Sequence, residues 1–181
     1  LVVSPLSLHA VNDLPGTLAQ IRRCLKPDGL FLGLLFGGQT LRELRDVLTA
    51  AEMEITGGLT PRIFPFVDIR DAGDLLARAG FALPVVDGEV LDVSYEHLFS
   101  LMADLRGMGE SNILHQRQKH LSSRRIFLRA AELYHTRYAN EEGRIPASFE
   151  LVTLTAWAPH ANQQQPAKRG SGKMNLGDAL R

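Results

Sequence analysis

The sequence Leu25-Lys26-Pro27-Asp28-Gly29 runs directly into Leu30-Phe31-Leu32-Gly33-Leu34-Leu35-Phe36, and this pair of segments points to an α/β fold. Proline, aspartate and glycine in the first segment are turn-forming residues that end a preceding helix. The second segment shows no polar alternation, which is typical of a parallel strand covered on both faces. A turn followed by a buried parallel strand is therefore predicted over residues 25–36.

The residues before this turn complete a strand–helix–strand unit. Residues 1–4 form a short apolar run that is rich in β-branched residues and ends at a proline, so a strand is predicted there. Asn12 and Asp13 are good helix caps, and apolar residues recur at helical spacing from Leu14 to Leu25. A strand, a helix and a second strand in this order form a βαβ unit of a parallel sheet.

The next segment predicts a second helix followed by an unusual loop. Residues 40–43, Thr-Leu-Arg-Glu, match a capping box, and apolar residues continue at helical spacing to about Met53. The loop from Gly57 to Phe66 contains two glycines and two prolines, yet its other residues are largely apolar. Because loops often carry functional residues, this apolar loop is predicted to line a site.

Helical and strand-like patterns alternate through the rest of the chain. The predicted elements are a helix from Asp68 to Gly80, strands over 81–86 and 89–95 joined by a hairpin at Asp87-Gly88, a helix over 98–105, a helix that buries Phe127, Ala131, Tyr134 and Tyr138, and a strand over 149–158. Residues 161–181 show no periodicity, so a flexible tail is predicted there.

Composition excludes several classes of protein. The 181 residues suffice for one domain, and 20 Lys and Arg balance 20 Asp and Glu, so there is no general basic field for nucleic acid. The longest apolar run, residues 30–36, is far shorter than a transmembrane helix, so no transmembrane segment is expected. The single cysteine, Cys24, cannot form an internal disulfide and is predicted to pack in a helical stripe. No histidine pair has zinc-ligand spacing, so no metal site is predicted.

Several segments resemble class I S-adenosylmethionine-dependent methyltransferases of the type 11-like group. The turn Leu25–Gly29 resembles the turn before their fifth strand, and Ser4–Asp13 resembles the segment that leaves their fourth strand. Residues 101–109 resemble the helical insertion of the malonyl-carrier methyltransferases of biotin synthesis. A closer resemblance, to the methyltransferase-like assembly factors of respiratory complex I, is carried by Phe36–Leu44, Asp71–Gly73, Ala79–Phe81, Met102–Asn112 and Thr155–His160.

The resemblance implies a partial Rossmann-like fold, strands 4 to 7 of the methyltransferase sheet, with a helical insertion over about 96–140. Residues 1–160 would form the carboxy-terminal part of that domain. The glycine-rich turn after the first strand and the acidic residue after the second, which hold the cofactor in this fold, do not occur here. The chain is therefore expected to be the carboxy-terminal two-thirds of a longer protein and to be inactive alone.

The resemblance also implies where ligands bind, because ligands of open parallel sheets lie beyond the carboxyl ends of the strands. The methionine half of S-adenosylmethionine is expected to face Ser4, Leu6, Leu8 and His9. The substrate is expected to contact Phe36, Gly37, Arg62, Phe64, Met108, Ser111 and Asn112. No catalytic residue is assigned, because methyl transfer needs alignment and exclusion of water more than an acid–base pair.

Three functions follow from the resemblance. The first is S-adenosylmethionine-dependent methylation of a protein or of a small acceptor bound to a carrier. The second is assembly of respiratory complex I, through hydroxylation of an arginine on one of its subunits. The third is a non-catalytic interaction module. The expected location is the bacterial cytoplasm or, in a eukaryote, the mitochondrial matrix.

Overall fold

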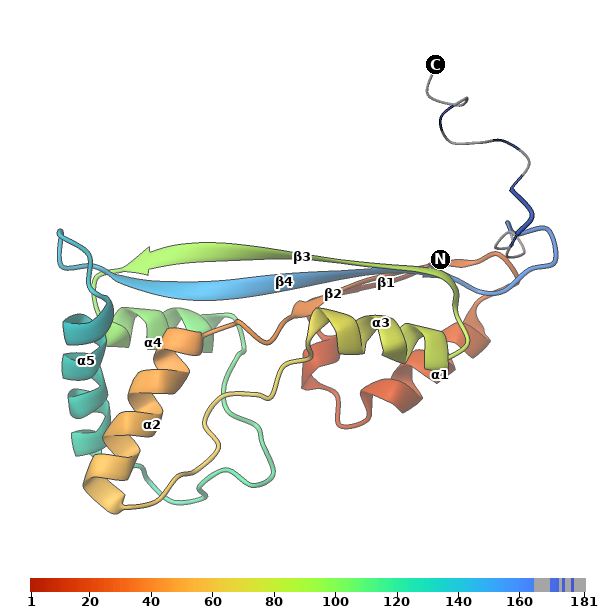
Figure 1. Ribbon diagram of the computed structural model, residues 1–181. Coiled ribbons are helices and arrows are strands. Elements are labelled where there is room, and N and C mark those ends of the chain that lie inside the picture. Colours follow the sequence, from red (N-terminus) through yellow and green to blue (C-terminus); the bar gives the residue numbers. More distant parts are fainter. Residues whose placement is uncertain (165–169, 173, 175–176, 178–181) are drawn as a thin grey trace.

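A mixed four-stranded sheet with helices packed beneath it forms the body of the protein (Figure 1). The computed structural model describes residues 1–164, 170–172, 174 and 177. In chain order the elements are β1 (Val2–Pro5), the short 3-10 helix η1 (Leu8–Ala10), α1 (Leu14–Cys24), β2 (Leu30–Phe36), α2 (Arg42–Thr56), α3 (Ile69–Arg78), β3 (Ala82–Tyr95), α4 (Leu98–Gly107), α5 (Arg124–Tyr138) and β4 (Ile145–Trp157). The predicted α/β class is confirmed.

The predicted βαβ unit is present. β1 pairs in parallel with β2, with Val3 opposite Leu32, and α1 connects them. The Asp13 side chain caps α1 by accepting a hydrogen bond from the backbone N–H of Gly16 at 2.8 Å. Local residue choice and long-range pairing therefore agree in this part of the chain.

The last strand of the chain occupies the middle of the sheet. The strand order is β1-β2-β4-β3, and β4 pairs antiparallel with both of its neighbours. Leu154 is opposite Gly33 of β2 on one side and Val86 of β3 on the other. β4 thereby joins the parallel β1–β2 pair to the long outer strand β3.

Two hydrophobic cores lie beneath the two ends of β4. The first contains Phe31, Leu35, Leu76, Val152 and Leu154, together with Leu18 from α1. The second lies among α2, α4 and α5 and is built from Leu44, Val47, Leu101, Ile126, Tyr134, Ile145 and Phe149. Residues of β4 take part in both, so this strand connects the two cores.

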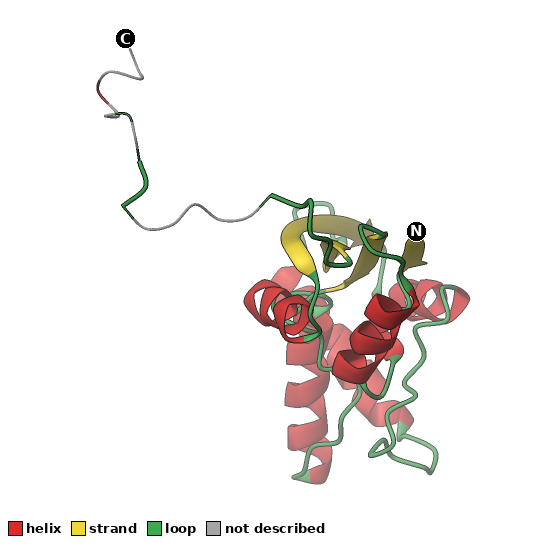
Figure 2. Ribbon diagram, turned by 90° about the vertical axis from the view of Figure 1, so that its right-hand side faces the viewer, coloured by secondary structure: helices red, strands yellow, loops and turns green. Residues whose placement is uncertain are grey.

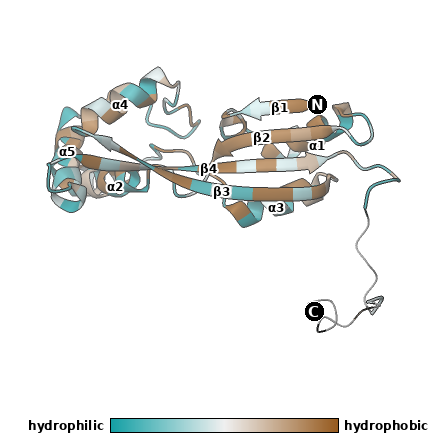
Figure 3. Ribbon diagram, turned by 90° about the horizontal axis from the view of Figure 1, so that it is seen from above, coloured by the Kyte–Doolittle hydropathy of each residue, from teal (hydrophilic) through white to brown (hydrophobic). Residues whose placement is uncertain are grey.

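The helices cover one face of the sheet only, as Figures 1 and 2 show. On the other face Val3 and Val85 are each 57% exposed, and Leu32 and Trp157 are half-buried. Figure 3 shows this face from above, with hydrophobic residues on the strands. The prediction that β2 is covered on both faces is wrong for this chain, because no described helix lies over that side.

The predicted hairpin at Asp87-Gly88 is also wrong. β3 continues through both residues as one strand from Ala82 to Tyr95. A Cβ atom on Gly88 would lie 2.4 Å from Cδ1 of Ile69 on α3. The glycine therefore permits α3 to pack closely against β3. Asp-Gly is also a common turn sequence, so the sequence alone does not separate a turn from this packing role.

The predicted capping box at residues 40–43 does not form. Leu41 is the cap of α2, with a positive φ of 55° and no side-chain hydrogen bond. Thr40 instead donates to the backbone carbonyl of Glu150 on β4, and Glu43 accepts a hydrogen bond from the Ser148 hydroxyl. Both side chains that the capping box would use are therefore hydrogen-bonded to β4 instead.

Three smaller expectations also change. In α5 the fully buried residues are Ile126, Ala130, Leu133 and Tyr134, so the buried stripe is displaced from the predicted one, whose Phe127, Ala131 and Tyr138 are only partly buried. Cys24 is exposed rather than packed. In the tail predicted over 161–181, residues 165–169, 173, 175–176 and 178–181 lie outside the described residues.

No helix among the described residues is long and apolar enough to cross a membrane.

The two glycines after β2 give a matched test of packing. A Cβ on Gly37 would lie 2.6 Å from Oε2 of Glu150 and 2.7 Å from Cγ2 of Val152, whereas a Cβ on Gly38 would meet no atom within 4 Å. Gly37→Ala is therefore expected to lower the free energy of unfolding by about 1–3 kcal/mol. Gly38→Ala is expected to change it by less than about 0.5 kcal/mol. Urea denaturation measures both, and equal stability of the two variants would contradict the packing argument.

Candidate functional site

The site lies beyond the carboxyl ends of β1 and β2, where parallel sheets bind ligands. η1 follows β1, and the segment from Gly37 leads from β2 into α2. The apolar loop before α3 returns to this edge, where the backbone N–H of Gly38 donates to the carbonyl oxygen of Val67 at 3.1 Å. Three segments that are distant in sequence therefore meet at one edge of the sheet.

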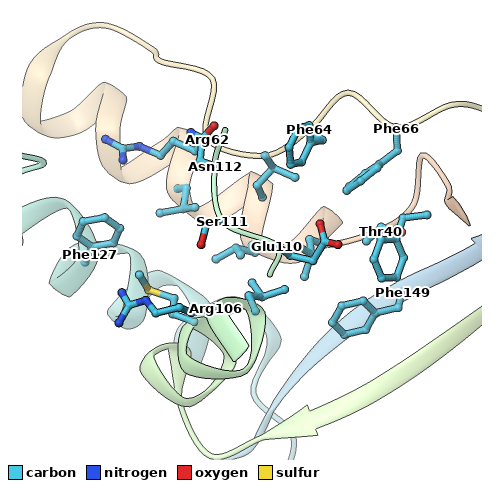
Figure 4. Close-up of a pocket in the computed structure, with 17 residues that line it drawn as sticks. Thr40, Arg62, Phe64, Phe66, Arg106, Glu110, Ser111, Asn112, Phe127 and Phe149 are labelled. Carbon is cyan, nitrogen blue, oxygen red and sulfur yellow. The ribbon is translucent and has the colours of Figure 1, made fainter. Parts of the chain in front are cut away.

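A pocket of about 290 Å³ opens at this edge, between α2, α4, α5 and the apolar loop (Figure 4). This volume is at the low end of ligand sites, about 300–1,000 Å³, so the pocket suits a side chain or a small group. Its aromatic walls are Phe36, Phe64, Phe66, Phe127 and Phe149. The apolar loop therefore does line a cavity, as its composition predicted.

Aromatic rings pack against one another along the wall of the pocket nearest the sheet. The ring centroids of Phe36 and Phe66 are 6.0 Å apart, and those of Phe36 and Phe149 are 5.9 Å apart. Phe64 lies 6.2 Å from Phe66. Such spacing is typical of interacting aromatic pairs, and the rings give the pocket a water-excluding wall.

The side chain of His9 is buried behind this wall and pairs with Glu110. The Nε2 atom of His9 lies 3.0 Å from Oε1 of Glu110, and the His9 side chain is only 2% exposed. The ring of His9 is 4.9 Å from that of Phe36 and 5.9 Å from that of Phe66. Glu110 itself lines the pocket, so the pair connects η1 to the loop that follows α4.

Arg62 is held in a polar network rather than left free. Its Nη2 atom lies 2.7 Å from Oε1 of Glu52 and also donates to the side chain of Gln118. Its Nη1 atom donates to the hydroxyl of Ser122. Burial alone would raise the pKa of Glu52, but hydrogen bonds from Arg62 and Thr60 outweigh it and lower the pKa below its usual value. The positive charge of Arg62 is therefore neutralised by a buried carboxylate.

The structure brings together most of the predicted substrate-contacting residues. Phe36, Arg62, Phe64, Ser111 and Asn112 all line the pocket. Asn112 is fixed there because its side-chain amide donates to the carbonyl oxygen of Pro61 at 2.8 Å. Two others lie elsewhere: Gly37 is packed under Glu150, and Met108 is 51% exposed and does not line the pocket.

The residues expected to contact S-adenosylmethionine divide into two groups. Ser4 is partly exposed and Leu6 is 41% exposed, so both are accessible at the carboxyl end of β1. The side chain of Leu8 is packed in the first core, and that of His9 is bound to Glu110. Ser4 and Leu6 therefore fit a role in binding the cofactor, whereas Leu8 and His9 would support it only through their position or backbone.

A second, wider hollow of about 660 Å³ lies on the other side of the apolar loop. It shares Ile63, Phe64 and Phe66 with the first pocket and extends to Asn12 and Gly38, which follow β1 and β2. Residues of the loop therefore line both the smaller pocket and the wider hollow next to the strand ends.

Sequence reasoning missed two charged residues of the pocket, Glu110 and Arg106. Glu110 lies within the segment 102–112 that carried the family resemblance, and this is the signal that would have drawn attention to it. Its pairing with His9, 101 residues earlier, has no local signature. Arg106 belongs to α4, and its guanidinium makes no hydrogen bond or ion pair with any residue that the structure describes.

The Glu52–Arg62 pair predicts a pH-dependent stability. Because the pKa of Glu52 is lowered by folding, its carboxylate stabilises the fold above pH 4.5, and this contribution is lost as the pH falls through the lower folded-state value. Glu52→Gln is expected to cost about 3 kcal/mol at pH 7, because it leaves a mostly buried guanidinium without its partner.

Urea denaturation at pH 7 and at pH 3 measures the effect. The difference in free energy of unfolding between wild type and Glu52→Gln should be smaller at pH 3. Glu54→Gln is the control, because Glu54 pairs with Arg129 on the exposed surface and little change is expected. A gap that stays constant between the two pH values would contradict the role of the Glu52 carboxylate.

Comparison with known proteins identifies relatives along the whole chain, although no family model matches it. The chain is 50% identical over 181 residues to the mitochondrial arginine hydroxylase NDUFAF5 of Rattus norvegicus, covering 100% of this chain and 52% of that protein. It is 49% identical to the protein of the same name from Homo sapiens, over 98% of this chain and 51% of the relative.

A malonyl-acyl-carrier protein O-methyltransferase of Xylella fastidiosa is 37% identical over 87% of this chain and 51% of the relative. A solved methyltransferase-like structure from Bacillus halodurans matches 88% of this chain and 69% of that chain, with a TM-score of 0.50 at 16% identity, which supports the fold alone. The chain spans about half the length of these curated relatives, rather than the expected two-thirds. Over nearly its whole length the chain is therefore homologous to about half of the NDUFAF5 proteins and of the malonyl-carrier methyltransferases.

Proposed function

We propose that this chain supplies the acceptor-binding part of a methyltransferase-fold enzyme that modifies an arginine side chain of a protein. The observation that carries the proposal is the combination of aromatic rings and a carboxylate in the pocket of about 290 Å³. Its inner end, next to the carboxyl ends of the strands, combines phenylalanine rings with the carboxylate of Glu110. A guanidinium group is bound well by a carboxylate and by the faces of aromatic rings.

The relatives support the same acceptor. Those that are about half identical to this chain are named arginine hydroxylases, whereas the malonyl-carrier methyltransferase is 37% identical. A pocket of about 290 Å³ also accommodates one side chain of a protein substrate more readily than a large free molecule. By analogy with the assembly factors that the sequence resembles, the substrate would be a subunit of respiratory complex I, in the bacterial cytoplasm or the mitochondrial matrix.

S-adenosylmethionine is the cofactor that the family implies, and when bound it supplies an electrophilic methyl group. Hydroxylation of the acceptor would instead require an oxidant, such as dioxygen together with a two-electron reductant. Ser4, partly exposed near the end of β1, and Leu6, exposed just after this strand, would hold the methionine half of S-adenosylmethionine. Phe64 and Phe66 line both the acceptor pocket and the open hollow near the strand ends. These rings would orient the acceptor and exclude water where the two ligands meet.

A second candidate is S-adenosylmethionine-dependent methylation of a carboxyl group on an acyl chain attached to a carrier. The observation that favours it is Arg106, which lines the same pocket and whose guanidinium has no partner among the described residues. A free guanidinium beside apolar walls suits an acyl group that ends in a carboxylate. The two candidates thus assign opposite charges to the group that enters the pocket.

Mass spectrometry of proteins from cells with and without the gene distinguishes the candidates. The proposal predicts an arginine-containing peptide that gains about 16 mass units for one oxygen, or about 14 for one methyl group, only when the gene is present. A gain of about 14 on a carrier-bound acyl group instead would favour the second candidate. If neither modification depends on the gene, the proposal is wrong, and a non-catalytic interaction module becomes the favoured hypothesis.

A further inference from the structure

We propose that Glu110 binds the guanidinium group of the acceptor through its Oε2 atom, and that the buried His9 is the positioning residue that holds Glu110 in place. The inference rests on the proposed function, because it names the groups of that pocket that recognise the acceptor. It also makes a specific claim about a residue outside the pocket, since His9 is behind the wall rather than part of it.

The burial of His9 is the first step. Its side chain is 2% exposed among the rings of Phe36, Phe64 and Phe66, and its Nδ1 atom has no hydrogen-bond partner among the described residues. A buried polar atom without a partner destabilises the fold, and an apolar side chain would fill the same aromatic cage without that penalty. A packing role alone therefore does not account for a histidine here.

The hydrogen bond to Glu110 defines what the histidine does. A carboxylate only accepts, so Nε2–H of His9 donates to Oε1 of Glu110 across 3.0 Å. This bond fixes the orientation of the carboxylate, in the same way that a second group orients a catalytic or ligand-binding side chain elsewhere.

The other carboxylate oxygen remains available. Oε2 of Glu110 makes no hydrogen bond to any described residue, and the side chain, 17% exposed, lines the pocket. The pocket wall also contains Phe36, Phe64 and Phe66, whose rings surround its partner His9. One free carboxylate oxygen among aromatic rings offers a guanidinium a charge-assisted hydrogen bond together with cation–π contact.

The cations that line the pocket do not oppose this arrangement. Arg62 is neutralised by Glu52 at 2.7 Å, and its guanidinium lies 5.5 Å from the ring centre of Phe127. Figure 4 shows the guanidinium groups of Arg62 and Arg106 on the Phe127 side of the pocket, with Glu110 on the side of Phe66 and Thr40. A guanidinium that points toward the strand ends therefore meets a carboxylate rather than another cation.

The position of His9 also connects two binding regions. His9 belongs to η1, which follows the accessible Ser4 and Leu6, whereas Glu110 belongs to the loop after α4. A shift of η1 on cofactor binding would therefore be transmitted to the carboxylate that orients the acceptor. The His9–Glu110 hydrogen bond would thus set the position of the acceptor relative to residues 4–9, the segment expected to face the cofactor.

Binding measurements on the 181-residue chain test the inference. Nuclear magnetic resonance titration with Nα-acetyl-arginine amide should give saturable shifts at Phe64 and Glu110. The citrulline analogue, which has nearly the same shape without the charge, should bind at least tenfold more weakly. Glu110→Gln should weaken binding of the arginine probe to the same extent, while Glu54→Gln, which changes a surface acid, should bind as wild type does.

His9 variants separate a positioning role from a packing role. His9→Phe fills the aromatic cage without a donor and should keep or raise the melting temperature, yet lose arginine binding at least tenfold. His9→Gln retains an N–H donor and should recover part of the binding. Wild-type affinity in His9→Phe would overturn the positioning role, and wild-type affinity in Glu110→Gln, or no saturable binding by the wild type, would overturn the subsite.

Mass spectrometry of cellular proteins distinguishes failure of the Glu110 subsite from failure of the proposed function. An arginine modification that depends on the gene but is unaffected by Glu110→Gln would overturn this inference and leave the proposed function standing. Selective arginine binding that depends on Glu110, without any gene-dependent modification, would do the reverse.

Discussion

The central position of β4 is the constraint on which the rest of the structure depends. Its first half supplies Ile145, Ala147 and Phe149 to the core between the α2, α4 and α5 helices, and its second half supplies Val152, Leu154 and Ala156 to the core beneath β1 and β2. Both neighbouring strands take their register from it. A slip of one residue would turn every one of these side chains to the opposite face, so the pairing has little freedom.

Hydrogen bonds of buried polar groups connect β4 to the segment that leads into α2, next to the pocket. Glu150 accepts a hydrogen bond from the backbone N–H of Gln39 at 2.7 Å, and Ser148 donates to Glu43 at 2.6 Å. Burial raises the pKa of Glu43, but hydrogen bonds from Ser148 and Arg42 outweigh it, so the net pKa is lowered. These contacts fix the start of α2 against β4. The pocket between α2, α4 and the apolar loop inherits its shape from that attachment.

The sequence pattern predicted the elements correctly where residue preferences and long-range pairing favour the same structure, as in β1, α1 with its Asp13 cap, and β2. They failed where a distant partner decides the outcome. Gly88 serves the approach of Ile69 rather than a turn, and Thr40 and Glu43 bond to β4 rather than to their own helix. The loop 57–66 was identified from composition, and five of seven predicted substrate residues line the pocket. The His9–Glu110 pair spans 101 residues, and no pattern within one segment encodes such a contact.

The order of the strands also has a consequence for how the chain acquires its structure. As the polypeptide leaves the ribosome, β2 and β3 emerge well before the strand that must separate them. Until residue 157 is available, each presents an unpaired backbone edge, and the two could pair with each other incorrectly. Because the closing contacts join residues more than 100 positions apart, formation of the sheet is expected to be slow and to follow synthesis. Chaperone binding during that interval would protect these edges from aggregation.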